Sequence, residues 1–221
     1  MIGTSLSLED FARYFENNRL GRLYFPNGKC FTPNGEWFED GKITQFHINL
    51  RDLYNLIIGW KINNAGISLD DVVGVIAFGS AVRHPGYRVT SKTGKKYLFF
   101  GPEITGKINV PIQPNDADFL VITGQDIIKE KVLKPTSLAT YDCGTWITKG
   151  GIHLVNRGIH QILNSVREND TISISAMREG VPIFYDGRLG EVQSRVGIKK
   201  ETPRRLLWNK DEDGYLFGKI E

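Results

Sequence analysis

Two aspartates at the start of an apolar segment have the spacing that most directly indicates chemistry. Asp116 and Asp118 open the stretch "DADFLVITG". Alternate residues of a β-strand point to the same side of the sheet, so the two carboxylates are expected to lie side by side. Like charges at that distance repel unless a cation lies between them, and Mg²⁺ typically binds one or two carboxylates together with substrate phosphates. The pair therefore predicts a divalent-metal site, with Mg²⁺ or Mn²⁺ as the ion.

A Gly-Ser corner after an earlier apolar run indicates a matching anion site. In "GVIAFGSAVRHPG", Gly79 and Ser80 directly follow a strand-like segment. Glycine lets the backbone turn tightly, and the amides that follow it, with the Ser80 hydroxyl, can point at an anion. A helical turn starting at Ser80 would present free N–H groups to a phosphate, and Pro85 requires that turn to be short. A phosphate cradle beside metal-binding carboxylates is what phosphoryl transfer requires.

Each motif is ambiguous when taken alone. Gly-Ser occurs in many loops, and Asp-x-Asp is often a turn or a solvated strand end. Their order is more informative: an apolar strand, then Gly-Ser-x-x-Arg, then Asp-x-Asp opening a second apolar strand.

This order resembles the nucleotidyltransferase superfamily, which includes DNA polymerase beta, the CCA-adding enzymes and the minimal nucleotidyltransferases. "FGSAVR" is similar to its Gly-Ser motif, "DADFLVI" to its metal-binding strand, and "AMREGVPIFYDG" to the helix and strand that end its minimal members. The resemblance covers residues 72–186. It implies a nucleoside triphosphate as donor, two Mg²⁺ ions, and transfer of a nucleoside monophosphate to a hydroxyl, phosphate or protein acceptor.

The resemblance also implies roles for individual residues. Gly79 and Ser80 would hold the triphosphate, and Arg83 would steady either the loop or a phosphate. Asp116 and Asp118 would carry the metal ions, which in two-metal sites serve the attacking and leaving oxygens.

The chain departs from the family pattern where a third acid is usual. The strand that best fits that place is "GIHLVNRG", which offers His153 in place of a carboxylate. His153 is a candidate metal ligand or general base, because an ordinary histidine pKa is about 6.5. It is equally a candidate for a buried, hydrogen-bonded histidine in an inactive or differently built site. Asp142 is a second candidate for the third acid, although "TYDCG" is more typical of a turn.

A second departure is the long interval between Ser80 and Asp116. The segment 86–114 is predicted as an inserted hairpin with its turn at Thr93-Gly94. The hairpin contains Lys92, Lys95 and Lys96. If the hairpin overhangs the nucleotide, these lysines can reach its phosphates; otherwise they are solvated surface side chains.

Two further functions remain open at this level. The missing third acid favours a catalytically impaired module that binds nucleotide, RNA or a protein partner, as an antitoxin does. Asp-x-Asp is also the metal motif of nucleotide-sugar glycosyltransferases, although the Gly-Ser corner has no role in them. The sequence does not indicate the acceptor, which can be RNA, a small molecule or a protein. It also does not indicate the oligomeric state or which nucleoside triphosphate is preferred, ATP or another.

Hydrophobic periodicity and turn residues predict the elements that position these groups. A helix capped by Ser7 is followed by short strands around the turns "FPNG" and "TPNG". A second helix starts near Asn49. Further strands are predicted at 72–78, 117–123, 145–148, 152–155 and 181–186, and further helices at 125–133, 158–167 and 171–179, the last ending at Gly180. The tail after Asp186 is predicted to be irregular, with a hairpin around "DEDG".

The mixture of local turns and helical connections predicts the α+β class, with a mixed sheet flanked by helices. We expect an N-terminal extension over residues 1–48, a nucleotidyltransferase-like core over 49–186 with the inserted hairpin, and a C-terminal tail over 187–221 packed on the core.

Composition is ordinary for a soluble globular protein. The 221 residues are 40% hydrophobic and 24% charged, with a net charge of +3 that tolerates a phosphorylated partner without requiring one. No apolar stretch is long enough to span a bilayer, and no leader pattern opens the chain. Cys30 and Cys143 do not indicate a disulfide framework or a zinc site. A cytoplasmic protein with reduced thiols is expected.

Overall fold

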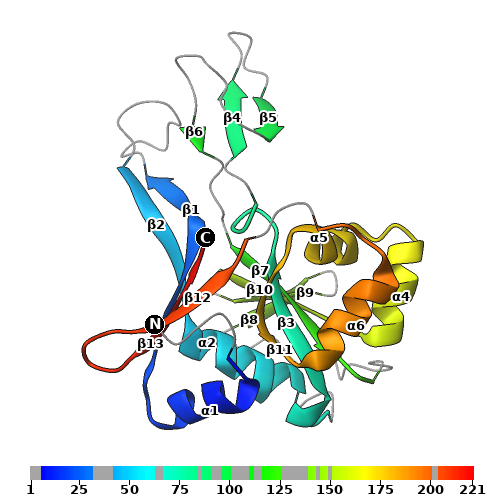
Figure 1. Ribbon diagram of the computed structural model, residues 1–221. Helices are drawn as coiled ribbons and strands as arrows, with labels where there is room; N and C mark the ends of the chain where they lie inside the picture. Colours follow the sequence, from blue (N-terminus) through cyan, green and yellow to red (C-terminus); the bar gives the residue numbers. More distant parts are fainter. Residues whose placement is uncertain are drawn as a thin grey trace.

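A six-stranded mixed sheet lies at the centre of the fold (Figure 1). The computed structural model describes residues 6–31, 42–62, 67–83, 86–90, 96–100, 110–111, 116–125, 139–142, 145–148, 151–200 and 204–221. The strand order is β11-β3-β7-β10-β9-β8. The strands are β3 (Val72–Phe78), β7 (Ala117–Thr123), β8 (Ala139–Asp142), β9 (Thr145–Thr148), β10 (Ile152–Gly158) and β11 (Val181–Tyr185).

The two innermost long strands are buried on both faces. Every residue of β3 is buried, and in β7 only Asp118 is not. The continuous apolar runs in these strands, rich in Val, Ile and Phe, fit a sheet covered on both sides. β3 runs antiparallel to β7, whereas β10 runs parallel to it. The end of β3 and the beginnings of β7 and β10 therefore meet at one end of the sheet.

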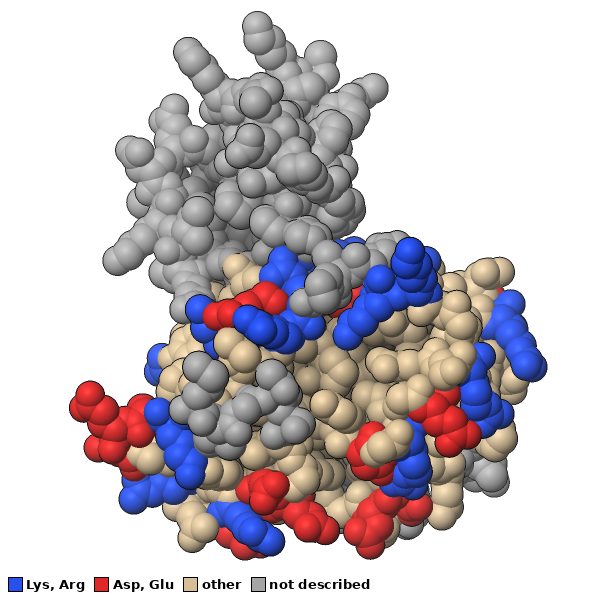
Figure 2. Space-filling view, viewed as in Figure 1, with Lys and Arg blue, Asp and Glu red and all other residues tan. Residues whose placement is uncertain are grey.

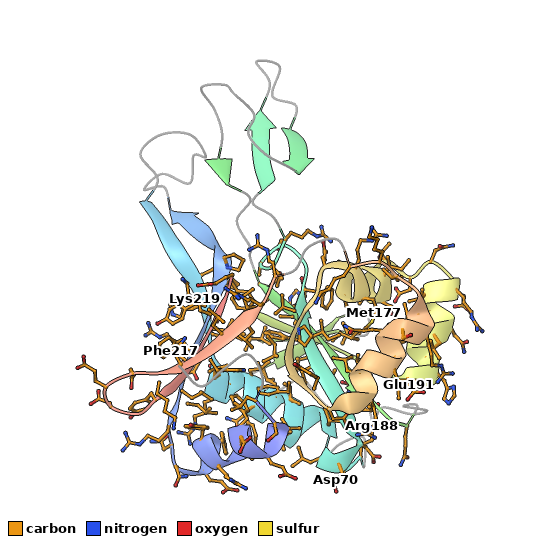
Figure 3. All side chains as sticks on the ribbon, in the orientation of Figure 1. Asp70, Met177, Arg188, Glu191, Phe217 and Lys219 are labelled. Carbon is orange, nitrogen blue, oxygen red and sulfur yellow. The ribbon has the colours of Figure 1, made fainter. Side chains whose placement is uncertain are left out.

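Three helices cover one face of this sheet, namely α4 (Ile159–Arg167), α5 (Thr171–Glu179) and α6 (Gly187–Val196) (Figure 1). Met177 of α5, labelled in Figure 3, is buried in the cluster that Ile76 and Leu120 form on that face. Arg188 of α6 donates a 2.8 Å hydrogen bond to the carbonyl of Asp70 in the short 3₁₀ helix Leu69–Asp71 (Figure 3). α6 is thereby fixed at the start of β3.

The opposite face packs on α1 (Leu8–Glu16), α2 (Leu50–Tyr54) and the π-helical segment Asn55–Ile62 that continues α2. Phe11 of α1 is fully buried, and its ring centroid lies 4.4 Å from that of Phe184. The Ser7 hydroxyl accepts a hydrogen bond from the amide of Asp10, which satisfies one free N–H group at the start of α1.

A second sheet joins the two ends of the described chain. Its order is β12-β13-β1-β2, and its strands are β1 (Leu20–Phe31), β2 (Lys42–Asn49), β12 (Leu206–Lys210) and β13 (Leu216–Ile220). β1 and β13 pair in parallel. Trp208 of β12 is fully buried and stacks on Phe184 at 5.9 Å, so this sheet shares the core of the α1 face.

A small third sheet, in the order β5-β4-β6, stands beyond the end of the central sheet in Figure 1. It consists of β4 (Gly86–Thr90), β5 (Lys96–Phe100) and β6 (Val110–Pro111). β4 and β5 pair antiparallel, which confirms the predicted hairpin strands. Its predicted turn and the residues Lys92 and Lys95 lie outside the described residues.

Most predicted elements are confirmed. The α+β class is confirmed, and so are the predicted strands at 72–78, 117–123, 145–148, 152–155 and 181–186. The predicted helices at 158–167 and 171–179 correspond to α4 and α5, and the final hairpin is β12-β13. Gly180 caps α5 as expected. The predicted helix at 125–133 and the "TPNG" turn fall mainly on residues that are not described. No described helix is long and apolar enough to cross a membrane.

Two predictions about the terminal segments are wrong. "FPNG" is not a turn between short strands, because it lies inside β1, where the pairing with β2 shifts register between Tyr24 and Gly28. A bulge tolerates proline, which cannot donate to the ladder. The tail after Asp186 is not irregular, because α6 occupies residues 187–196. The two terminal segments, expected as separate additions, share one sheet through β1 and β13.

Candidate active site

Asp118 lies at the end of the central sheet where three strand ends meet. It pairs in register with Phe78 of β3 on one side and with His153 of β10 on the other. Asp116 is two residues earlier, immediately before β7. The side chains of Asp116 and Asp118 are 27% and 28% exposed, so solvent and a ligand can both reach them.

His153 contacts both carboxylates. Its Nε2 atom lies 3.2 Å from Oδ2 of Asp116, and its Nδ1 atom lies 3.2 Å from Oδ1 of Asp118. One ligand atom from each of the three residues lies within 4.8 Å of the others. Because β10 is parallel to β7 and His153 is the register partner of Asp118, this contact is set by strand pairing.

The surrounding charges favour the protonated form of His153. The hydrogen bond to Asp118 raises the pKa of the imidazole; burial opposes this, and the negative charges of Asp116 and Asp118 raise the pKa further. The net shift is upward from the ordinary value. A protonated ring between two carboxylates provides the positive charge that the pair requires, and a metal ion can provide the same charge.

The Gly-Ser corner directly faces Asp118. Gly79 has a φ of 77°, in the left-handed region, and a Cβ atom there would lie 2.3 Å from Oδ2 of Asp118. Only glycine allows the carboxylate to come this close to the turn. The turn is held by backbone hydrogen bonds from the amides of Val82 and Arg83 to the carbonyl of Gly79, at 3.1 and 3.0 Å. The half-buried Ser80 follows Gly79 in this turn.

The structure places the Arg83 side chain against α5. Its Nε atom donates a 2.5 Å hydrogen bond to Oε1 of Glu179, and its Nη2 atom donates to the hydroxyl of Ser175 at 3.1 Å. The Ser175 hydroxyl in turn donates to Glu179. Because α5 ends where β11 begins beside β3, this network ties the turn to the helix layer.

Asp170 caps the N-terminus of α5. Oδ2 of Asp170 accepts hydrogen bonds from the amide of Ser173 at 3.1 Å and from its hydroxyl at 2.7 Å. Burial raises the pKa of Asp170, but these bonds, a further bond from the amide of Ile172 and the charge of Arg157 outweigh it, so the net pKa is lowered.

Of the site residues predicted from sequence, five lie together at this end of the sheet. They are Gly79, Ser80, Asp116, Asp118 and His153. Arg83 belongs to the same turn, and its guanidinium contacts Glu179. Asp142 lies on β8 at the far edge of the sheet, beyond β9, and its side chain is not described. Lys96 begins β5, and nothing is described of its side chain.

Sequence reasoning did not connect Arg204 with the site. Its Nη2 atom donates a 3.3 Å hydrogen bond to the carbonyl of Arg83, at the end of the turn. The two residues are 121 positions apart, and no local pattern connects them. The available signal was the pair of adjacent arginines at 204 and 205, which is more typical of solvated surface than of a binding site.

The donor set fits a divalent cation. Carboxylate oxygens are suitable ligands for Mg²⁺ and Mn²⁺, whereas an imidazole nitrogen favours first-row transition ions over Mg²⁺. Asp116, Asp118 and His153 therefore suit Mn²⁺ at least as well as Mg²⁺.

No protein-family model, curated protein or solved structure matches the chain.

Proposed function

We propose that the protein is a metal-dependent nucleotidyltransferase, which transfers a nucleoside monophosphate from a nucleoside triphosphate to an acceptor hydroxyl or phosphate, or to a protein side chain. The observation that carries this proposal is the direct contact between the metal-ligand candidate Asp118 and the Gly79 turn. Phosphoryl transfer depends mainly on positioning and on neutralising charge, and this contact brings the two necessary parts together.

The chain's own residues have separate tasks in this proposal. Asp116 and Asp118 would hold the metal ion, and His153 would supply a third ligand or accept a proton. The backbone amides at the start of the turn, before those of Val82 and Arg83 that bond to the Gly79 carbonyl, would bind a phosphate of the donor. The bound metal would neutralise charge on the phosphates and on the leaving pyrophosphate. β3 and β7, which are buried on both faces, give both parts a rigid base.

The first test is binding. Thermal unfolding is measured with each of the four nucleoside triphosphates in the presence of Mn²⁺ or Mg²⁺. A ligand at 100 times its dissociation constant stabilises the folded state by about 2.7 kcal/mol, which is readily detected. Asp116→Asn and Asp118→Asn should abolish the shift while the variants remain folded. Asp70→Asn, an exposed aspartate at the other end of β3, is the matched control and should retain it.

The second test is transfer. Wild-type protein is incubated with triphosphates labelled at the α-phosphate, Mn²⁺, and RNA, small-molecule or protein acceptors including itself. Covalent label that depends on Asp116 and Asp118 supports the proposal. Full transfer by both asparagine variants, or no stabilisation of wild-type protein by any triphosphate, contradicts it.

A second candidate is a nucleotide-binding module without transferase activity. It is favoured by one observation, the presence of His153 where the resembled family usually has a third carboxylate. This alternative predicts stabilisation by a triphosphate and metal without label on any acceptor. Label appearing after His153→Asp, and absent from wild-type protein, would identify the histidine as the residue that prevents transfer.

A further inference from the structure

Arg204 brings a positive charge from the C-terminal part of the chain to the Gly79 turn. It lies two residues before β12 and contacts the carbonyl of Arg83 through Nη2 at 3.3 Å. Figure 1 shows β12 starting near the end of the central sheet where β3 finishes. Figure 2 shows Lys and Arg side chains, interspersed with acidic ones, along the upper edge of the coloured body.

Arg204 has no acidic partner among the described residues. Its half-buried guanidinium makes one hydrogen bond to a carbonyl, and its Nε atom is buried with no hydrogen-bond partner. The two other arginines discussed above do have acidic partners: Arg83 pairs with Glu179, and Arg188 pairs with Asp186.

The partial burial of the Arg204 charge is expected to destabilise the protein when no ligand is bound. Burial lowers the pKa of the Arg204 guanidinium from its usual range, and no charge among the described residues offsets the effect. An arginine nevertheless stays protonated, so a partly desolvated positive charge persists in the fold. Partial burial of an unpaired cation is unfavourable, and a bound anion would remove much of that penalty.

The position of Arg204 suits an extended anion. The turn carbonyl it contacts belongs to Arg83, and the same turn begins at Gly79 beside Asp118. An anion reaching both Arg204 and the metal-ligand candidates must extend along the turn, as a chain of phosphates does. Arginine binds phosphate through two parallel N–H groups, and Arg204 uses only one of its two Nη atoms in the described contacts.

We propose that Arg204 binds the phosphate tail of the donor nucleotide at the Gly79 turn. This inference rests on the proposed function and adds a substrate-binding residue to it. Arg83, the arginine of the Gly-Ser motif, already has an anionic partner in Glu179. Arg204 supplies a second positive charge at the end of the turn, through its contact with the carbonyl of Arg83.

The variants separate charge from geometry. Arg204→Gln removes the charge, and Arg204→Lys retains it but loses the planar pair of donors. Arg205→Gln is the matched control, because Arg205 is adjacent, equally charged and exposed. The probes are Mn²⁺ alone, inorganic tripolyphosphate with Mn²⁺, and the triphosphate that stabilises wild-type protein most. Affinities are measured by calorimetry, with the unfolding temperature of each variant as the folding control.

We expect Arg204→Gln to weaken tripolyphosphate and triphosphate binding at least about tenfold, which corresponds to losing a charge-assisted hydrogen bond. Mn²⁺ affinity should be unchanged, Arg204→Lys should be intermediate, and Arg205→Gln should match wild-type protein. The unfolding temperature of Arg204→Gln without ligand should not fall, because the variant removes a half-buried charge that has no acidic partner among the described residues.

The remaining outcomes separate the two proposals. Equal triphosphate binding by wild-type protein and Arg204→Gln overturns the role of Arg204 and leaves the proposed function in place. Tripolyphosphate binding that depends on Arg204, without binding of any triphosphate, supports the anion site and rejects the transferase. Binding of neither polyphosphate nor triphosphate by wild-type protein rejects both. Loss of Mn²⁺ affinity in Arg204→Gln shows a structural role and overturns phosphate binding as its explanation.

Discussion

Oδ2 of Asp118 lies where any residue other than glycine at position 79 would place its side chain, 2.3 Å from an ideal Cβ. Asp118 lies on β7, and Gly79 directly follows Phe78, which ends the neighbouring antiparallel strand β3 and is the register partner of Asp118. The glycine therefore has two functions: its φ of 77° allows the turn, and its missing side chain leaves room for the carboxylate.

Gly79→Ala should damage both the fold and the site. A left-handed backbone costs a non-glycine residue about 1–2 kcal/mol, and the new methyl group must displace the Asp118 carboxylate. We expect a lower free energy of unfolding in urea by at least that amount. We also expect weaker Mn²⁺ binding, measured by electron paramagnetic resonance of the free ion.

Gly190→Ala is the control for this variant. Gly190 is exposed within α6, and a Cβ atom there meets nothing within 4 Å. Alanine in a helix interior is favoured over glycine by about 0.5–1 kcal/mol, so this variant should be more stable and bind Mn²⁺ normally. A Gly79→Ala protein that matches wild type in both measurements contradicts the close approach.

The contact between His153 and Asp118 should make the stability of the metal-free protein depend on pH. The hydrogen bond to Asp118 raises the pKa of His153 in the folded state, against the opposing effect of burial. Below the unfolded pKa of about 6.5 the ring is charged in both states and contributes its full stabilisation. As the pH rises through the higher folded pKa, the ring loses its proton and the contribution disappears.

Urea unfolding in the presence of EDTA, from about pH 6 upward, measures this effect. Wild-type protein should lose more stability with rising pH than His153→Gln, in which position 153 does not titrate. Parallel pH curves for the two proteins would show that the ion pairs of His153 contribute nothing to folding.

Two motifs of the candidate site could be predicted from the sequence because they are local. Alternate residues of a strand point to the same side, which places Asp116 and Asp118 on one face. A glycine directly after a buried strand, as at position 79, indicates a turn. The pairing of β10 with β7 joins segments that are distant in the sequence. The sequence therefore offered His153 as a candidate site residue but could not predict its contact with both carboxylates. The approach of Arg204 could not be predicted, since it depends on the path of the whole C-terminal segment.

The errors in the fold have similar physical causes. Gly187 and Gly190 are poor helix formers and concealed α6, although Leu189 and Val192 keep helical spacing and are buried. Pro-Asn-Gly normally signals a turn, but in β1 the bulge absorbs it within a long strand. The parallel pairing of β1 with β13 joins distant segments, and no periodicity in either strand reports its partner.

The ion pair between Arg83 and Glu179 should be measurably stabilising. Its Nε–Oε1 distance is 2.5 Å, and the side chains are 36% and 15% exposed. In a double-mutant cycle with Arg83→Met and Glu179→Gln, we expect a coupling free energy of about 1 kcal/mol, at the upper end of the range for partly exposed pairs.

Arg13 and Asp10 on α1 form the comparison pair. Their atoms are 3.7 Å apart and their side chains are 73% and 48% exposed, so solvent screening should leave a coupling of at most about 0.5 kcal/mol. If the Arg83–Glu179 coupling is no larger than this, α5 does not hold the turn through this pair, and the backbone bonds to Gly79 must be sufficient.

Asp170 should link the stability of α5, and with it the support of Arg83, to acid pH. Burial raises the pKa of Asp170, but the bonds from Ser173 and Ile172 and the charge of Arg157 lower it further than burial raises it. A carboxyl group with a depressed folded pKa stabilises the protein above its unfolded pKa of about 3.9, and this stabilisation is lost as the pH falls through the folded pKa.

Two variants separate the cap from the charge. Asp170→Ala removes the cap and should cost about 1 kcal/mol at neutral pH, measured by urea unfolding. Asp170→Asn keeps an oxygen that can accept from the Ser173 amide but does not titrate, so it should be less destabilising at neutral pH. Relative to wild type, its deficit should shrink as the pH falls below about 3.9, since protonation removes the same charge from the native aspartate. If the difference in unfolding free energy between wild type and Asp170→Asn does not change with pH, the hydrogen bonds alone account for the stabilisation, and the charge of Asp170 does not contribute.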